Sequence, residues 1–155
     1  MSELDVGAKA PDFSLPRDGG GTVSLADFAG RKLVLYFYPK DDTSSCTNEA
    51  IDFTALIGDF NKAGASVVGI SPDSAKKHDK FIAKHGLKVI LAADEDTATI
   101  KAYGVWKEKQ MYGRTYMGVE RATFLIGPDG AILERWHVAR VAGHAEAVLA
   151  AVQAA

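Results

Sequence analysis

Apolar residues are distributed along the chain in two different patterns. The runs at 33–38 and 66–71 are apolar without alternation, which is typical of central strands that are covered on both faces by helices. Between them, apolar residues recur every three or four positions and predict one helix that ends near Gly64. These residues are Cys46, Ala50, Phe53, Ile57 and Phe60. Strand, helix and strand within roughly forty residues predict a βαβ unit with parallel strands.

Turn and cap signals predict the other elements. The glycine-rich residues 17–21 separate two short strands, 12–15 and 22–24, in an N-terminal β-hairpin. The further predicted elements are a short helix at 25–29, a helix from 72–74 to Gly86, a strand at 88–91, a helix at 94–103, a hairpin with strands 122–126 and 131–136, and a helix at 144–153. This order resembles the thioredoxin-like arrangement. We therefore expect an α/β fold with a central mixed β-sheet flanked by helices.

One stretch of the chain is assigned no element. Around Trp106, Tyr112 and Tyr116 it combines aromatic with basic residues. A substrate-side loop and a partner surface both stay open as interpretations.

Length and composition narrow the class of protein. With 155 residues, 47% hydrophobic and 25% charged, the chain is expected to form one globular domain over residues 1–155. The net charge of −2 and the lack of a basic block disfavour nucleic acid and anionic membranes as partners. Residues 1–5 are acidic and do not resemble a secretory signal. A cytoplasmic location is expected.

The chain contains a single cysteine, Cys46. An intramolecular disulfide and a cysteine-rich zinc site are therefore excluded. The four histidines show no ligand spacing, so we expect no metal and no other cofactor. Cys46 lies at the predicted start of a helix, where unpaired N–H groups and the helix dipole favour the nucleophilic thiolate. The alternative is a buried cysteine that acts only as a small hydrophobic residue.

The residues around Cys46 resemble a known active site. The segment Pro39-Lys40-Asp41-Asp42-Thr43-Ser44-Ser45-Cys46 resembles the peroxiredoxin loop P-x-x-x-T-x-x-C. The flanking residues 37–41 and Thr47-x-Glu49-Ala50 resemble the bacterioferritin comigratory protein (PrxQ) subfamily in particular. Segments 7–15, 68–71 and 121–126 extend the resemblance over nearly the whole chain.

The resemblance implies a role for each matching residue. Cys46 would be the peroxidatic cysteine, Thr43 would offer its hydroxyl to peroxide and thiolate, Pro39 would shield the site from water, and Arg121 would hold positive charge against both. We add the hypothesis that Glu49 orients Arg121 through a fork-like ion pair. From the residues alone, Thr43 could be a helix cap, Pro39 the end of a strand, Arg121 a surface arginine, and Glu49 a partner of the helix dipole.

The sequence departs from the family at the positions of the resolving cysteine. Many PrxQ proteins carry that thiol five residues after the peroxidatic one, where this chain has Ile51, and others carry it within the segment that is 81–84 here. The resemblance, combined with the cysteine count, predicts a one-cysteine mechanism that is completed by an external thiol. Thioredoxin, glutaredoxin and a low-molecular-weight thiol all stay open as reductants, and the resemblance favours a monomer.

The predicted function is thus a peroxidase that reduces hydrogen peroxide and organic hydroperoxides. Two alternatives stay open. The first is a redox-inactive thioredoxin-fold module that binds or chaperones other proteins. The second is a disulfide reductase, which could not complete its cycle alone because it lacks a second thiol.

Overall fold

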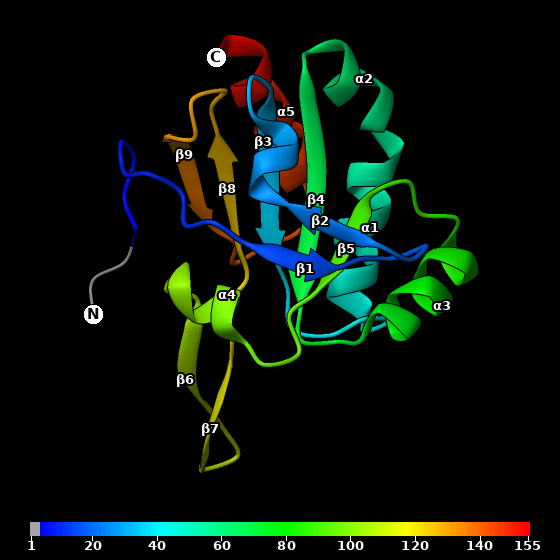
Figure 1. Ribbon diagram of the computed structural model, residues 1–155. Coiled ribbons are helices and arrows are strands. Elements are labelled where there is room, and N and C mark those ends of the chain that lie inside the picture. The colour runs from blue at the N-terminus through cyan, green and yellow to red at the C-terminus, as the bar shows by residue number, and fades with distance from the viewer. Residues whose placement is uncertain (1–3) are drawn as a thin grey trace.

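A computed structural model describes residues 4–155; residues 1–3, part of the acidic start on which the predicted location rests, lie outside that range. Within the described residues, five strands form the central sheet in the order β5-β4-β3-β8-β9 (Figure 1). These strands are β3 (Lys32–Phe37), β4 (Ala65–Ser71), β5 (Ile90–Ala93), β8 (Ala122–Ile126) and β9 (Ile132–His137). The pairs β3–β4 and β4–β5 are parallel, while β3–β8 and β8–β9 are antiparallel. The predicted mixed sheet with a βαβ unit is confirmed.

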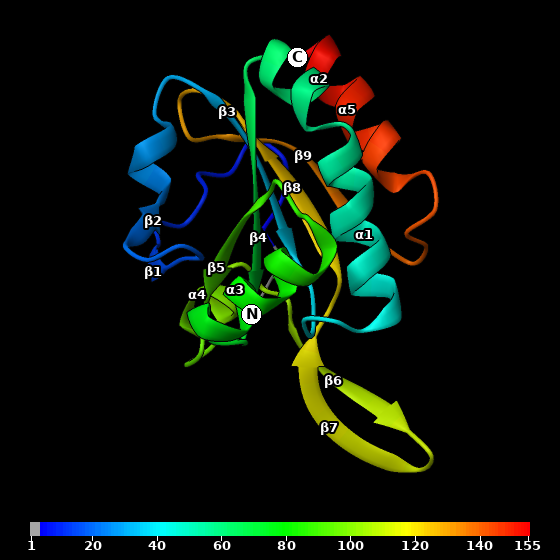
Figure 2. The same ribbon diagram turned by 90° about the vertical axis from the view of Figure 1, so that its right-hand side faces the viewer.

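Helices cover both faces of the sheet (Figure 2). One face carries α1 (Ser44–Ala55), α2 (Ile57–Lys62), α3 (Ala75–His85) and α5 (His144–Ala154), and the other carries the 3₁₀ helix η1 (Leu25–Phe28), α4 (Ala98–Ala102) and the N-terminal hairpin of β1 (Ser14–Pro16) and β2 (Thr22–Ser24). Along β3, Val34 and Tyr36 face the first layer, whereas Leu35 and Phe37 face the second. Both sets are buried, which explains why the sequence of β3 is apolar without alternation.

Aromatic packing fixes α1 on the sheet. The Tyr36 ring stacks on Phe53 of α1 with 4.8 Å between centroids, and on Tyr38 with 5.5 Å. Gly69 on the neighbouring strand makes room for this ring, since a Cβ at that position would lie 2.6 Å from Tyr36 Cζ. Stacked rings contribute beyond their buried area, so Phe53 holds α1 firmly against the sheet.

The helix predicted from residue 46 to Gly64 is wrong in one respect, because it is divided at Leu56. The Leu56 N–H donates to the carbonyl of Phe53, a tight turn that ends α1 before α2 begins at Ile57. Phe53 and Phe60, on either side of the turn, are both buried, with 5.8 Å between their rings. The apolar spacing alone could not distinguish one helix from two.

The helix predicted at 94–103 is also shorter than expected. The Asp94 carboxylate accepts the N–H groups of Thr99 at 3.3 Å and Ile100 at 2.7 Å, and Thr97 has a left-handed φ of 61°. These side-chain bonds replace the first turn with a loop, so α4 starts at Ala98. The preceding strand was predicted from residue 88, but β5 begins at Ile90, because Ile90 is the first residue that pairs with β4, opposite Val68.

The stretch without a predicted element forms a β-hairpin. Strands β6 (Trp106–Met111) and β7 (Arg114–Val119) pair antiparallel and project away from the rest of the molecule (Figures 1 and 2). The turn residues Tyr112 and Gly113 have φ of 54° and 75°. Positive φ at both positions is the geometry of the hairpin turns that match strand twist.

None of the helices in residues 4–155 is long and apolar enough to cross a lipid bilayer.

Candidate active site

A pocket of about 600 Å³ lies where the loop between β3 and α1 meets the base of the β6–β7 hairpin. Of the residues singled out from the sequence, Pro39, Thr43, Cys46 and Arg121 line this pocket. Glu49 lies behind Arg121 and is fully buried, with 1% of its surface exposed. The structure therefore brings all five together, although Arg121 is far from the others in sequence.

Cys46 lies in the first turn of α1 and is 2% exposed. Thr43 precedes the helix in an extended conformation, and its carbonyl accepts the N–H of Thr47 at 2.8 Å. The N–H groups of the first turn have no acceptor within the helix. Cys46 thus lies in the positive field of a helix N-terminus.

One guanidinium contacts both the thiol and a carboxylate. Arg121 comes directly before β8, and its Nη2 lies 3.2 Å from Cys46 Sγ. Its Nη1 donates to Glu49 Oε1 at 2.6 Å. The Arg121 carbonyl accepts the N–H of Val138, which holds the backbone in place. The predicted fork-like pair is wrong in its geometry, because a single N–H···O contact joins Arg121 to Glu49 while Nη2 faces Cys46. The guanidinium can therefore neutralise a thiolate while Glu49 fixes its orientation.

Burial shifts the protonation equilibria of the groups around Arg121. Desolvation raises the pKa of Glu49 to about 7, while Arg121 acts in the opposite direction. Burial alone would lower the pKa of Arg121, but Glu49 and Cys46 outweigh it and raise that pKa. Desolvation, together with the positive charge of Arg121, lowers the pKa of His144 to about 4. Near neutral pH, Arg121 is thus charged and His144 is neutral.

Thr43 is exposed and lines the pocket beside Cys46. Its hydroxyl donates to the carbonyl of Lys40 at 3.0 Å, and within the described residues its side chain makes no capping bond to α1. The hydroxyl oxygen keeps its acceptor capacity.

The hairpin wall of the pocket comes from the stretch to which the sequence assigned no element, with a substrate-side loop as one of the two open interpretations. Trp106, Lys109, Tyr116 and Met117 line the side opposite α1. Burial lowers the pKa of Lys109, as does the nearby charge of Arg121. The sequence signal was present in Tyr112-Gly113, but a tyrosine in the first position is not the usual hairpin turn residue.

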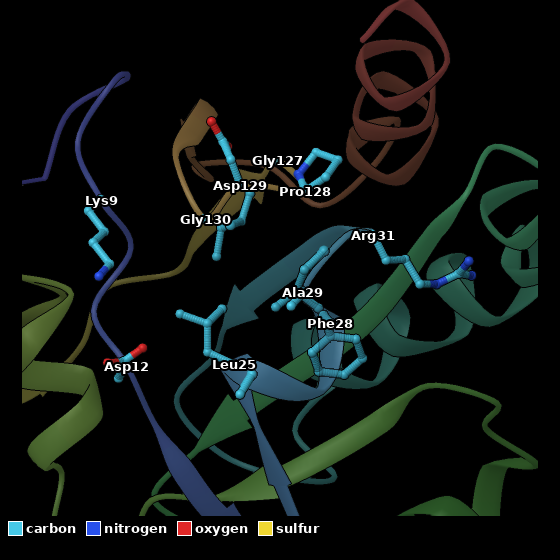
Figure 3. A pocket seen from close by; sticks show the side chains of 13 residues that line it. Lys9, Asp12, Leu25, Phe28, Ala29, Arg31, Gly127, Pro128, Asp129 and Gly130 are labelled. Atoms are coloured by element: carbon cyan, nitrogen blue, oxygen red, sulfur yellow. The ribbon is translucent and has the colours of Figure 1, made fainter.

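Other parts of the molecule offer less chemistry. A second pocket, of about 180 Å³, lies on the opposite face of the sheet beside η1 and the turn that connects β8 to β9 (Figure 3). Arg31 lies at its edge, and its Nε donates a hydrogen bond to Ser66 Oγ at 2.8 Å. Across residues 4–155, no group of three or more His, Cys, Asp or Glu side chains could hold a metal ion.

Comparison with known proteins agrees with the geometry. Residues 6–135 match the AhpC/TSA family. Peroxiredoxin Bcp of Xanthomonas campestris is 48% identical over 151 residues, which cover 97% of this chain and 94% of the relative. A structure of the X. campestris bacterioferritin comigratory protein, described for its alkyl peroxide reduction activity, has a TM-score of 0.90 at 47% identity and covers 97% of this chain and 98% of its own. A crystal structure of a Xylella fastidiosa PrxQ mutant has a TM-score of 0.93 at 40% identity, with coverage of 99% and 98%.

A buried thiol at a helix N-terminus in contact with a guanidinium defines a thiol-based redox enzyme on a thioredoxin-like fold. The chain belongs to the AhpC/TSA family, within which it is a peroxiredoxin of the Bcp, or PrxQ, type. It is accordingly a thiol peroxidase, which acts on peroxides and needs a thiol reductant.

Proposed function

We propose that Cys46 reduces peroxides by direct attack of its thiolate on one peroxide oxygen. The O–O bond breaks, two electrons pass from sulfur to the peroxide, and Cys46 becomes a sulfenic acid. The other oxygen leaves as hydroxide or alkoxide and takes up a proton. The observation that carries this proposal is the 3.2 Å contact between Arg121 Nη2 and Cys46 Sγ at the pocket.

Arg121, Thr43 and Pro39 assist in different ways. Arg121 stabilises the thiolate and the negative charge that develops on the peroxide oxygen. Thr43, exposed at the pocket mouth, offers its hydroxyl to the peroxide, and Pro39 limits the access of water. The shared pocket supports these roles, and the ion pair with Glu49 supports its assignment as the residue that orients Arg121.

An external thiol completes the cycle. The single cysteine means that no second thiol in the chain can attack the sulfenic acid. A first external thiol would form a mixed disulfide with Cys46 and release water, and a second would restore the Cys46 thiol as the two external sulfurs join. Thioredoxin, glutaredoxin and a low-molecular-weight thiol are all compatible with this chemistry.

The pocket supports alkyl hydroperoxides as substrates besides hydrogen peroxide. The side chains of Trp106, Tyr116 and Met117 give its hairpin wall an apolar surface that would contact an alkyl chain. The reduction of alkyl peroxides described for the X. campestris relative agrees with this substrate class.

We further propose that residues 1–155 act as one domain and as a monomer in the cytoplasm. The single-domain proposal is supported by hydrophobic clusters on the two faces of one continuous sheet.

The decisive assay follows peroxide consumption with dithiothreitol, for the wild type and for Cys46→Ser. The wild type should consume peroxide continuously and the variant should not. If both proteins are equally inactive, the proposed peroxide reduction by Cys46 is wrong. Activity of the variant equal to that of the wild type would remove Cys46 from the mechanism.

A further inference from the structure

The loop that connects β3 to α1 is tied from beneath to α3. Asp41 lies in this loop, two residues before Thr43, and is largely buried. One oxygen of its carboxylate accepts the Tyr38 hydroxyl at 2.5 Å, and the other lies 2.6 Å from Nδ1 of His78 on α3. No sequence motif connects His78 with the active-site loop. The segment between them includes α1, α2 and β4.

The His78 ring makes hydrogen bonds through both of its nitrogens. Its ring is fully buried, and Nε2 lies 3.0 Å from the carbonyl of Ala92. A carbonyl only accepts hydrogen bonds, so Nε2 must carry a hydrogen. Nδ1 lies 2.6 Å from Asp41 Oδ2, so a hydrogen bond joins the ring to the carboxyl group. His78 and Asp41 therefore form a buried hydrogen-bonded pair.

The surrounding groups balance this pair and hold the backbone of the loop. Asp73, between β4 and α3, accepts the N–H of Asp41 at 2.7 Å and the Ser71 hydroxyl at 2.8 Å. Lys77 of α3 lies 3.8 Å from the second Asp73 oxygen. Both the backbone and the side chain of Asp41 are thus anchored.

The anchor acts on the residues that meet the peroxide. The Thr43 hydroxyl is bonded to Lys40, on the other side of Asp41, and the Thr43 carbonyl starts α1. A shift of Asp41 would therefore move the Thr43 hydroxyl and the first turn that carries Cys46. Misplacement by about 1 Å can cost on the order of a hundredfold in rate.

We propose that the buried Asp41–His78 pair is a positioning device for peroxide reduction, so that α3 acts as a clamp on the active-site loop. This inference rests on the proposed function, in which Thr43 and Cys46 meet the peroxide. His78 touches neither the substrate nor the reacting sulfur in this scheme. It acts through Asp41.

The test compares the rate constant of Cys46 oxidation by hydrogen peroxide in His78→Gln, Asp41→Asn and the double variant. Each single variant should react about tenfold more slowly than the wild type. Because the pair acts as a unit, the double variant should lose no more than the worse single variant. Additive losses, or a His78→Gln rate equal to that of the wild type, would overturn the proposal.

Two matched controls separate positioning from general destabilisation. Asp79→Ala removes a polar contact of the same helix that does not reach the active-site loop, because Asp79 accepts the N–H of Gly19 at 2.7 Å, and Phe81→Leu loosens the buried side of α3. Both should keep the wild-type rate even where Phe81→Leu unfolds as easily as His78→Gln. If Phe81→Leu loses as much rate as His78→Gln, the effect of His78→Gln comes from lost overall stability and not from the position of the loop.

The first of two NMR measurements is made on the wild type and is independent of whether any variant folds. The Nε2–H proton of His78 should exchange slowly with solvent, because it is buried and hydrogen-bonded, and Asp41→Asn should change the ¹⁵N shift of His78 Nδ1. A His78 ring proton that exchanges freely with water, or an Nδ1 shift that does not respond to Asp41→Asn, would overturn the proposal. An inactive wild type would instead refute the proposed peroxidase function and leave the NMR measurements as the test of the Asp41–His78 pair.

Discussion

At the scale of single residues, the site depends on one guanidinium that is shared between two partners. Arg121 lies 3.2 Å from the Cys46 sulfur and 2.6 Å from a Glu49 oxygen. The second Glu49 oxygen, Oε2, has no hydrogen-bond partner within the described residues. Glu49 thus orients Arg121, but the burial of its carboxylate costs free energy of folding. This arrangement makes two residues open to direct tests.

Replacing Arg121 should slow peroxide reduction strongly. Arg121→Met removes the donor that faces the sulfur and the developing charge, and a loss of about a hundredfold or more in kcat/KM is expected. Arg121→Lys keeps the charge but cannot reach both partners in fork geometry, so a loss of about tenfold is expected. Steady-state peroxide consumption with dithiothreitol measures both. Equal activity of Arg121→Met and the wild type would contradict the assignment.

Glu49 should make the stability of the protein dependent on pH. Burial raises its pKa from 4.5 to about 7, so the folded state binds more protons than the unfolded state between these values. The free energy of unfolding should therefore fall as pH rises from 4.5 to 7, by at most about 3 kcal/mol from this group. Denaturant unfolding of the wild type and Glu49→Gln across this range measures the effect as a difference.

The comparison with Glu49→Gln is needed because His144 acts in the opposite direction. Its pKa is lowered to about 4, so its contribution to stability rises with pH between 4 and about 6.5. The difference between the two proteins cancels His144 and isolates Glu49. A difference that does not change between pH 4.5 and 7 would mean that Glu49 titrates normally.

At the scale of secondary structure elements, the sequence predicted those whose pattern is local. Runs of apolar residues placed β3 and β4, and the N-terminal hairpin followed from its glycines. The break at Leu56 was not predicted, because both helices continue the same apolar spacing. The start of α4 was misplaced, since the Asp94 carboxylate replaces a helical turn with side-chain bonds. Where a side chain competes with the backbone, periodicity gives no warning.

The β6–β7 hairpin should determine how well bulky peroxides bind. Tyr116 and Met117 line the active-site pocket and are half exposed. Truncating either to alanine removes apolar contact worth about 1 kcal/mol, so kcat/KM for cumene hydroperoxide should fall roughly fivefold. The value for hydrogen peroxide should stay unchanged. Steady-state assays with both substrates measure the contrast.

Tyr112→Ala serves as the matched control for the hairpin. Tyr112 lies at the tip, is 97% exposed and does not line the active-site pocket. Its removal should leave both substrates unaffected. A loss for cumene hydroperoxide in Tyr112→Ala, or none in the Tyr116 and Met117 variants, would contradict the assigned wall.

Helix α3 should stay folded throughout the reaction. It carries no cysteine that would have to reach Cys46, and His78 ties it to the active-site loop. Hydrogen exchange of the amides in Ala75–His85 should therefore be the same before and after treatment with peroxide. Faster exchange in this helix after oxidation would mean that α3 unfolds during the cycle.

At the scale of the whole molecule, the site is assembled from segments that the sequence keeps far apart. The thiol and its helix could be recognised locally, but nothing local placed Arg121 beside Cys46. In the sequence, only the family resemblance connected the two residues. In the structure, the antiparallel pairing of β3 and β8 places Arg121 next to the start of α1. The clamp by α3 has no sequence signature, because a buried histidine and a surface histidine look alike in sequence.

Cys46 begins a reaction that the chain cannot complete alone, because it contains no second thiol. The most direct measurement adds excess hydrogen peroxide to the reduced protein without thiol, and follows peroxide loss together with the mass of the Cys46 peptide. Locating the oxygen on that peptide is essential, since Met111 and Met117 are exposed and can also be oxidised.

The rapid phase should consume about one peroxide for each Cys46 and then stop, with one oxygen atom added to the Cys46 peptide. Added thiol should restore the cysteine and restart consumption, and Cys46→Ser should show no rapid phase. Continuous turnover without any thiol, or a rapid phase in Cys46→Ser, would contradict the one-cysteine mechanism.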